Sequence, residues 1–64
     1  MYERVHTEKG YYYLIDTAIF EGVEYGLYES ESYGDEVPAI VLSYLTLKVV
    51  GETFDTLSEF FNTL

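Results

Sequence analysis

The acidic segment from Glu29 to Glu36 is the part of the chain whose residue types and spacing come nearest to a metal site. Aligned with a calcium-binding loop, Glu29 and Glu31 take the first and third ligand positions, and Gly34 takes the position of the glycine. The last position, where such loops require a bidentate glutamate, is Ile40. The pattern fails at its strongest ligand, so it indicates a solvated acidic hairpin end rather than a metal site.

Catalytic chemistry has equally little support in the residue pattern. Twelve acidic residues among 64 make carboxylate pairs inevitable, so such pairs carry no information about acid–base catalysis. The single histidine, His6, has no nucleophile at a fixed spacing, and the five glycines follow no phosphate-loop pattern. A chain of 7.4 kDa also leaves little room for a substrate cleft. We therefore expect a protein that is not an enzyme and uses no cofactor.

Net charge sets the class of partner. Three basic side chains stand against twelve acidic ones, giving a formal charge of −9. Such a charge repels nucleic acids and anionic membrane surfaces and attracts cationic groups. We expect no direct contact with nucleic acid or membrane, and a basic or aromatic-rich protein surface as the partner.

Tyrosine is the second compositional signal, because it accounts for eight of the twelve aromatic residues. One helix covers only one face of a sheet, so the other face is left to present tyrosine and acid together, as binding surfaces do. Tyr44 is the clearest candidate, since it alternates with Leu45 and Leu47, which we expect to face the helix. The predicted partner-binding residues are three tyrosines and four carboxylates: Tyr12, Tyr28, Tyr44, Glu29, Glu31, Asp35 and Glu36.

The elements that must position these residues follow from alternation and turn signals. Residues 11–20 and 23–32 are expected strands, joined by a turn at Glu21-Gly22. Alternation drifts in the second of them, so either a bulge adds a residue, which Gly26 favours, or the strand runs past the core into water. A third strand is expected to run from Pro38 to Val50, because period-2 alternation continues up to Gly51. Residues 2–7 are either a strand or a loose arm.

A helix is expected near the C-terminus, capped by Thr53 or by Thr56, the latter with Glu59 at the capping-box spacing. Its apolar stripe should pack on Leu45, Leu47 and Val49. The stripe consists of Phe54, Leu57, Phe60, Phe61 and Leu64. The sequence thus predicts one small α+β domain over residues 1–64, a three- or four-stranded antiparallel meander with one C-terminal helix packed on one face.

Two function classes remain open. The first is an acidic protein-interaction module, in its sharper form an inhibitor whose carboxylates stand in for the phosphates of a nucleic acid. In size and charge alone the chain is similar to small inhibitors from phages and mobile elements. The carboxylates of that form are Glu21, Glu24, Glu29, Glu31, Asp35 and Glu36. The second class is a structural homo-oligomer, because so short a chain buries only about 60% of its surface.

The N-terminal residues and the cysteine content give an expectation for the cellular location. Met1-Tyr2-Glu3-Arg4 is not a basic start followed by an apolar run, so we expect no signal peptide. The sequence contains no cysteine and therefore no disulfide framework. Both features lead us to expect a cytoplasmic protein.

Overall fold

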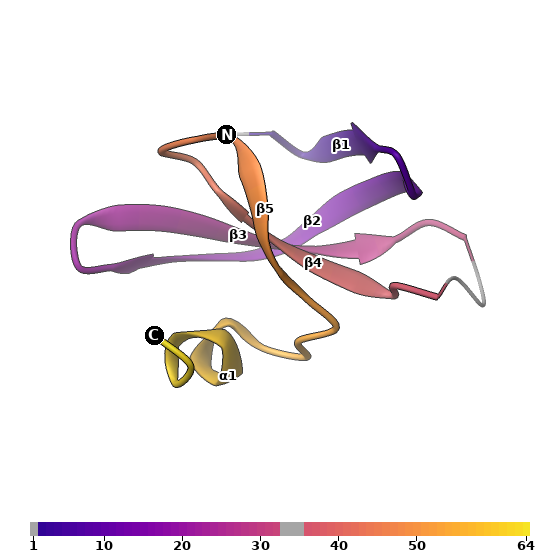
Figure 1. Ribbon diagram of the computed structural model, residues 1–64. Helices are drawn as coiled ribbons and strands as arrows, with labels where there is room; N and C mark the ends of the chain where they lie inside the picture. Colours follow the sequence, from indigo (N-terminus) through magenta and orange to yellow (C-terminus); the bar gives the residue numbers. More distant parts are fainter. Residues whose placement is uncertain (1, 33–35) are drawn as a thin grey trace.

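The computed structural model, which describes residues 2–32 and 36–64, is a five-stranded antiparallel half-barrel with one short C-terminal helix (Figure 1). The strands follow the order of the sequence: β1 (Arg4–Thr7), β2 (Gly10–Phe20), β3 (Val23–Ser30), β4 (Ala39–Ser43) and β5 (Lys48–Glu52). The helix α1 spans Leu57–Phe61. The antiparallel meander and the helix are confirmed. The strand number of three or four is wrong, and the fold is mostly β because the helix is a single short turn.

The β2–β3 hairpin is the longest element and is closed by Glu21 and Gly22. Their φ angles are 50° and 82°, so both residues are in the left-handed region. Two central residues with positive φ give a turn whose twist matches that of the flanking strands. The turn predicted from Glu21-Gly22 is therefore confirmed. It fixes the register in which Phe20 faces Val23.

A bulge in β2 decides which side chains face inward. The pairing with β3 passes from Leu14 opposite Tyr28 to Asp16 opposite Leu27, so Ile15 is the extra residue. Side chains of β2 exchange faces at this point, because an added residue breaks the alternation of period two. We expected a bulge in β3 near Gly26, and that position is wrong. Gly26 pairs regularly with Thr17 and has another role, described below.

The concave face of the half-barrel is filled by aromatic and branched side chains. Tyr12 and Tyr28 are completely buried there, and the Tyr12 hydroxyl donates a hydrogen bond of 2.8 Å to the carbonyl of Val37. That bond ties the segment before β4 to β2. The interior cluster as a whole consists of Tyr12, Tyr28, Val37, Ile40 and Leu42, with Val5, Leu14 and Tyr44 packed against it.

The segment we expected to be one strand from Pro38 to Val50 is two strands joined by a turn. Residues 44–47 form the turn, where the Leu47 amide donates to the Ser43 carbonyl at 2.7 Å. Leu47 has a φ of 57°, which an L-residue other than glycine, asparagine or aspartate seldom adopts. Tyr44, Leu45, Thr46 and Leu47 contain none of the usual turn residues, so the alternation concealed the turn.

The helix packs on the convex face, at a place we did not expect. Leu57 and Phe60 are buried against Leu27 of β3 and Val41 of β4. The expected contacts are instead exposed: Leu45 is 75% and Leu47 54% exposed in the turn, and Val49 of β5 is 40% exposed. The predicted packing site of the helix is thus wrong.

The start of the helix is decided by Thr56 rather than by Thr53. Thr56 has an extended backbone, and its hydroxyl accepts a hydrogen bond of 3.2 Å from the Glu59 amide. This is the geometry of a helix cap. Thr53 is excluded from that role because its φ of 63° is left-handed. The helix start at Thr56 that the sequence offered is confirmed, and the Glu59 carboxylate accepts a hydrogen bond of 3.4 Å from the Asp55 amide.

Candidate protein-binding surface

The convex face has two ends, and α1 covers only one of them. At the other end β1, β2 and β3 present six neighbouring side chains in two contacting groups, which we name the tyrosine–carboxylate patch. Strand register places them on one face, because Arg4 is opposite Tyr13, His6 is opposite Tyr11, and Tyr13 is opposite Glu29. The patch consists of Arg4, His6, Tyr11, Tyr13, Glu29 and Glu31.

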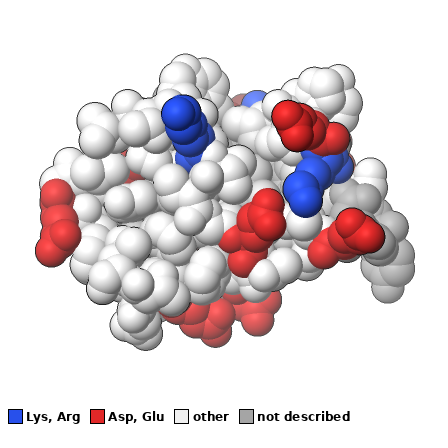
Figure 2. All heavy atoms as spheres, in the orientation of Figure 1, with Lys and Arg blue, Asp and Glu red and all other residues white. Residues whose placement is uncertain are grey.

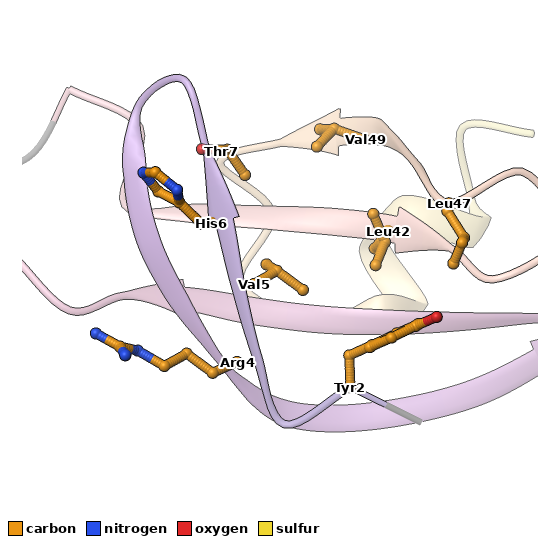
Figure 3. A pocket seen from close by; sticks show the side chains of 8 residues that line it. All are labelled: Tyr2, Arg4, Val5, His6, Thr7, Leu42, Leu47 and Val49. Atoms are coloured by element: carbon orange, nitrogen blue, oxygen red, sulfur yellow. The ribbon is translucent and has the colours of Figure 1, made fainter.

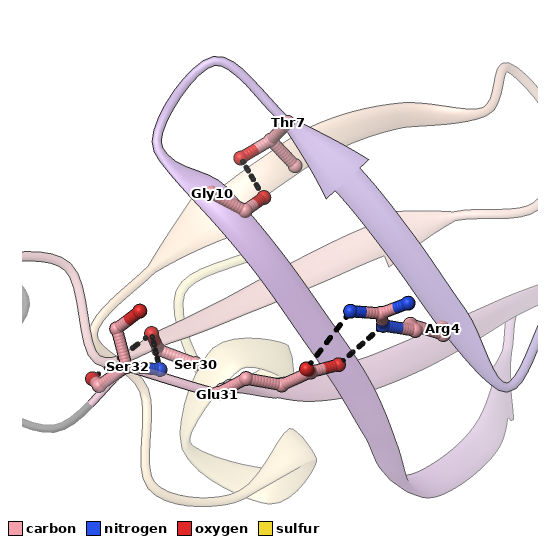
Figure 4. Close-up of polar contacts among 6 residues, drawn as sticks. All are labelled: Arg4, Thr7, Gly10, Ser30, Glu31 and Ser32. Carbon is pink, nitrogen blue, oxygen red and sulfur yellow. Dashed lines mark hydrogen bonds and ion pairs between the residues drawn. The ribbon is translucent and has the colours of Figure 1, made fainter.

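Arg4 is held in place by two kinds of contact. Its guanidinium donates to both carboxylate oxygens of Glu31, from Nε at 2.6 Å and from Nη2 at 3.1 Å (Figure 4). The same group lies 4.1 Å from the centre of the Tyr11 ring, a cation–π distance. The hydrogen bond with Glu31 raises the pKa of Arg4, so the guanidinium stays charged. A two-point contact of this kind fixes orientation as well as charge.

Tyr11 is a stacking platform. The His6 ring lies parallel to it, with ring centres 4.2 Å apart and an angle of 16° between planes. Tyr11 nevertheless remains 45% exposed. An aromatic ring that is fixed by neighbours and still open to solvent binds a partner at little cost in side-chain entropy.

Tyr13 and Glu29 form the other half of the patch. The Tyr13 hydroxyl donates a hydrogen bond of 3.1 Å to Oε1 of Glu29. This hydrogen bond raises the pKa of Tyr13, because the neighbouring carboxylate favours the protonated phenol. Tyr13 is 40% exposed. The patch therefore offers two oriented phenol rings and two carboxylates against one guanidinium.

The charge over the rest of the molecule is predominantly negative. Within residues 2–32 and 36–64, Arg4–Glu31 is the one ion pair. Figure 2 shows that Lys and Arg lie in the upper half of the view, on the side of β1 and β5, whereas Asp and Glu are spread over the face, including its lower edge. Most carboxylates therefore lack a counter-charge, and a cationic surface gains Coulomb energy by approaching them.

Tyr12, Tyr28 and Tyr44 lie elsewhere than we expected. We placed them on an open face, and the first two are 0% exposed on the concave side. Tyr44 is partly buried, and its hydroxyl lies 2.6 Å from that of Tyr28. The expected exposure is wrong because the half-barrel curls its concave face into a core. These rings hold the sheet that carries the patch.

The predicted carboxylates divide between the patch and its surroundings. Glu29 and Glu31 belong to the patch, and both are exposed. Glu36 is exposed beside a small hollow that it shares with Lys9, Tyr12 and Val37. Asp35 lies outside the described residues. A partner-binding role for these residues stays a prediction.

The carboxylates of the predicted nucleic-acid mimic do not share one face. Glu24 is opposite Ile19, and Glu29 is opposite Tyr13, within a β3 that pairs without a bulge of its own. Residues five positions apart on such a strand point to opposite faces. Glu21 stands in the β2–β3 hairpin turn and precedes both of them in the sequence. The predicted stripe is therefore split between the two faces of the hairpin.

Arg4, His6, Tyr11 and Tyr13 were missing from the predicted partner-binding residues. A signal for them is present, since Arg4 and His6 alternate with Val5, and Tyr11 and Tyr13 alternate with Tyr12. The alternation does not say which of the two sets is outside. That depends on the direction in which the sheet curls.

A second surface feature lies between the two edges of the half-barrel. A hollow of about 420 Å³ is bounded by β1 on one side and β4 and β5 on the other (Figure 3). Val5, Leu42, Leu47, Val49 and the Tyr2 ring line it, whereas the Arg4 side chain points away from it (Figure 3). A smaller hollow beside it, of about 210 Å³, is lined by Thr7, Glu8, Lys9, Ile40, Val49 and Glu52.

The described part of the chain brings together no group of three or more His, Asp or Glu side chains that could hold a metal ion. No helix in that part is long and apolar enough to cross a bilayer. Comparisons of the chain with protein-family models, with curated proteins and with solved structures yield no match.

Proposed function

We propose that this chain is a non-enzymatic interaction module that binds a cationic protein surface through the tyrosine–carboxylate patch. The single observation that carries the proposal is the pre-ordered set of Arg4, Tyr11 and Glu31, exposed on the uncovered end of the convex face. Tyrosine and arginine, with tryptophan, are enriched among the central interface residues that contribute most to binding. A net charge of −9 restricts the partner to a basic surface.

The geometry favours arginine or lysine side chains as the groups recognised. The carboxylate of Glu29 accepts one hydrogen bond from Tyr13 through Oε1, which leaves Oε2 for a donor from the partner. Tyr11 and Tyr13 offer ring faces on which a guanidinium stacks. Arg4 already satisfies Glu31, so it orients this carboxylate rather than competing for the partner.

The experiment compares two double variants of equal net charge. Glu29→Gln/Glu31→Gln removes the carboxylates of the patch, and Glu21→Gln/Asp55→Asn removes two exposed carboxylates elsewhere. Each protein is immobilised and exposed to a cell lysate, and bound proteins are released in steps of rising salt. The proposal predicts that the wild type and the control retain the same basic protein, which the patch variant releases at clearly lower salt.

Equal release from both variants would mean that charge alone holds the partner, and the assignment to the patch would fail. Retention of no basic protein by the wild type would contradict the proposed function itself. The nucleic-acid mimic is a finer form of the same proposal, and its support is the surplus of unpaired carboxylates. It predicts that duplex DNA or RNA competes with the immobilised chain for the released partner.

A further inference from the structure

We propose that two copies of this chain associate through the open seam between β1 and β5, each covering the apolar hollow of the other. This inference concerns a different surface from the tyrosine–carboxylate patch and does not depend on the proposed function. The surface in question, the seam surface, is made of five apolar side chains that are 40–75% exposed: Tyr2, Leu45, Leu47, Val49 and Val50.

The first argument is that the seam between β1 and β5 leaves part of the apolar interior open to solvent. Strand order makes β1 and β5 the two edges of the sheet, and each pairs with one neighbour among the described residues. The hollow between them is continuous with the buried interior, because Val5 and Leu42 contribute both to its lining and to the interior cluster. Covering the apolar surface of this hollow with a second apolar surface removes it from water, which is energetically favourable.

The second argument concerns the β4–β5 turn. Leu45 is 75% exposed, and Leu47 is 54% exposed in a left-handed conformation that disfavours leucine. Within one copy neither side chain gains burial that offsets these costs. A contact with a second molecule supplies a physical reason for leucine at both positions.

The third argument identifies the occupant as another copy. Apart from Arg4, which points away and is paired with Glu31, the charged residues that line the two hollows are Lys9 against Glu8 and Glu52, a sum of −1, although the chain carries −9. The β5 edge adds Lys48. Two molecules of charge −9 repel each other least when they meet at their neutral side. A strongly basic partner is attracted instead to the remaining surface, which carries the negative charge.

The small size of the chain also favours the association of two copies. A chain of 64 residues without cysteine has a small core and no disulfide to support it. Association through a two-fold seam adds the same apolar contact twice, because each residue of such an interface is used by both copies.

The test is sedimentation equilibrium of the full chain from micromolar to millimolar concentration, at low and at moderate salt. The wild type is expected to rise from 7.4 kDa to twice that mass, and added salt should not weaken the association. Leu45→Gln should raise the dissociation constant by about tenfold or more. Ile19→Gln is the matched control, since Ile19 is 70% exposed on the β2–β3 hairpin, and it should associate as the wild type does.

A second variant separates an interface role from a folding role. Asparagine tolerates the left-handed conformation of residue 47, so Leu47→Asn should leave the melting temperature of the dilute monomer unchanged or higher while it weakens association. Glu29→Gln/Glu31→Gln should associate at least as tightly as the wild type, which distinguishes this seam from the patch. A wild type that stays at 7.4 kDa throughout, or seam variants that associate like the wild type, would overturn the proposal.

Discussion

The hydroxyl groups of Tyr28 and Tyr44 lie 2.6 Å apart in the concave face of the half-barrel, directly over Gly26. The Tyr28 hydroxyl also donates to the backbone carbonyl of Tyr2, which ties the start of the chain to β3. A side chain at residue 26 would occupy the place of the Tyr44 hydroxyl. A glycine is therefore required within β3 at this position, because the rings of Tyr28 and Tyr44 approach its backbone closely.

Gly26→Ala should destabilise the fold by about 1–3 kcal/mol, because the added Cβ collides with Tyr44 and with the Tyr28 ring. Equilibrium denaturation measures the change. Combining it with Tyr44→Phe removes the hydroxyl that the Cβ meets, so the double variant should lose less than the sum of the single losses. Strict additivity of the two losses would contradict the packing described for Gly26.

Stability should fall at alkaline pH because of Tyr28. Burial, together with the hydrogen bond from Tyr44, raises the pKa of Tyr28 well above the ordinary tyrosine value of about 10. Above that value the unfolded chain loses a proton that the folded chain keeps, so the free energy of unfolding decreases as pH rises. Below it both states are protonated and the contribution is constant.

Denaturation at a series of pH values between neutral and strongly alkaline measures this dependence, and Tyr28→Phe should flatten it. The same substitution should cost about 1–2 kcal/mol at neutral pH, since it leaves the Tyr44 hydroxyl and the Tyr2 carbonyl without their partner. Tyr13→Phe serves as the comparison: the pKa of Tyr13 is also raised by its hydrogen bond with Glu29, but the phenol is exposed, so this substitution should remove less of the slope. An alkaline slope that survives Tyr28→Phe and disappears with Tyr13→Phe would reverse this assignment.

Thr56→Ala should destabilise the protein by about 1 kcal/mol, because the amide of Glu59 loses the hydroxyl that caps it. Ser58→Ala, an exposed position within the helix, should change stability by less than about 0.5 kcal/mol. Thermal melts of both variants provide the measurement. Equal losses from the two substitutions would indicate that the cap does not hold α1.

The melting temperature should rise from low to moderate salt. Twelve carboxylates face three basic groups, and salt screens the resulting self-repulsion. A gain of about 0.5 kcal/mol would appear as roughly 2–4 °C in a domain of this size. Melts in the sodium salts of two different monovalent anions separate screening from specific ion binding. A melting temperature that falls over this range would contradict the unpaired distribution of surface acids.

Local signals in the sequence predicted the elements that carry strong turn or cap chemistry. The Glu21-Gly22 turn, the Thr56 cap and the antiparallel meander follow from residue types whose backbone preferences are known. The β4–β5 turn was not predictable in this way, because Leu47 takes a left-handed conformation that its type disfavours. One unrecognised turn then moved Leu45 and Leu47 from the expected helix contact to the surface.

The candidate surface depended on a feature that the sequence does not contain. Tyr11, Tyr12 and Tyr13 alternate, so the pattern separates Tyr12 from its neighbours but does not say which side is buried. The curl of five strands makes the concave side a core, and it buries Tyr12 while leaving Tyr11 and Tyr13 open. The bulge at Ile15 adds a second change of face that residue types alone do not place.

The most direct test of the central claim is a nuclear magnetic resonance titration of the labelled chain with the basic protein that it retains. We predict that backbone signals of β1, of Tyr11–Tyr13 and of Glu29–Glu31 shift on binding, whereas those of α1 and of the Glu21-Gly22 turn stay in place. Shifts centred on α1 or on the hairpin turn, with the patch unchanged, would contradict the assignment of the tyrosine–carboxylate patch as the binding surface.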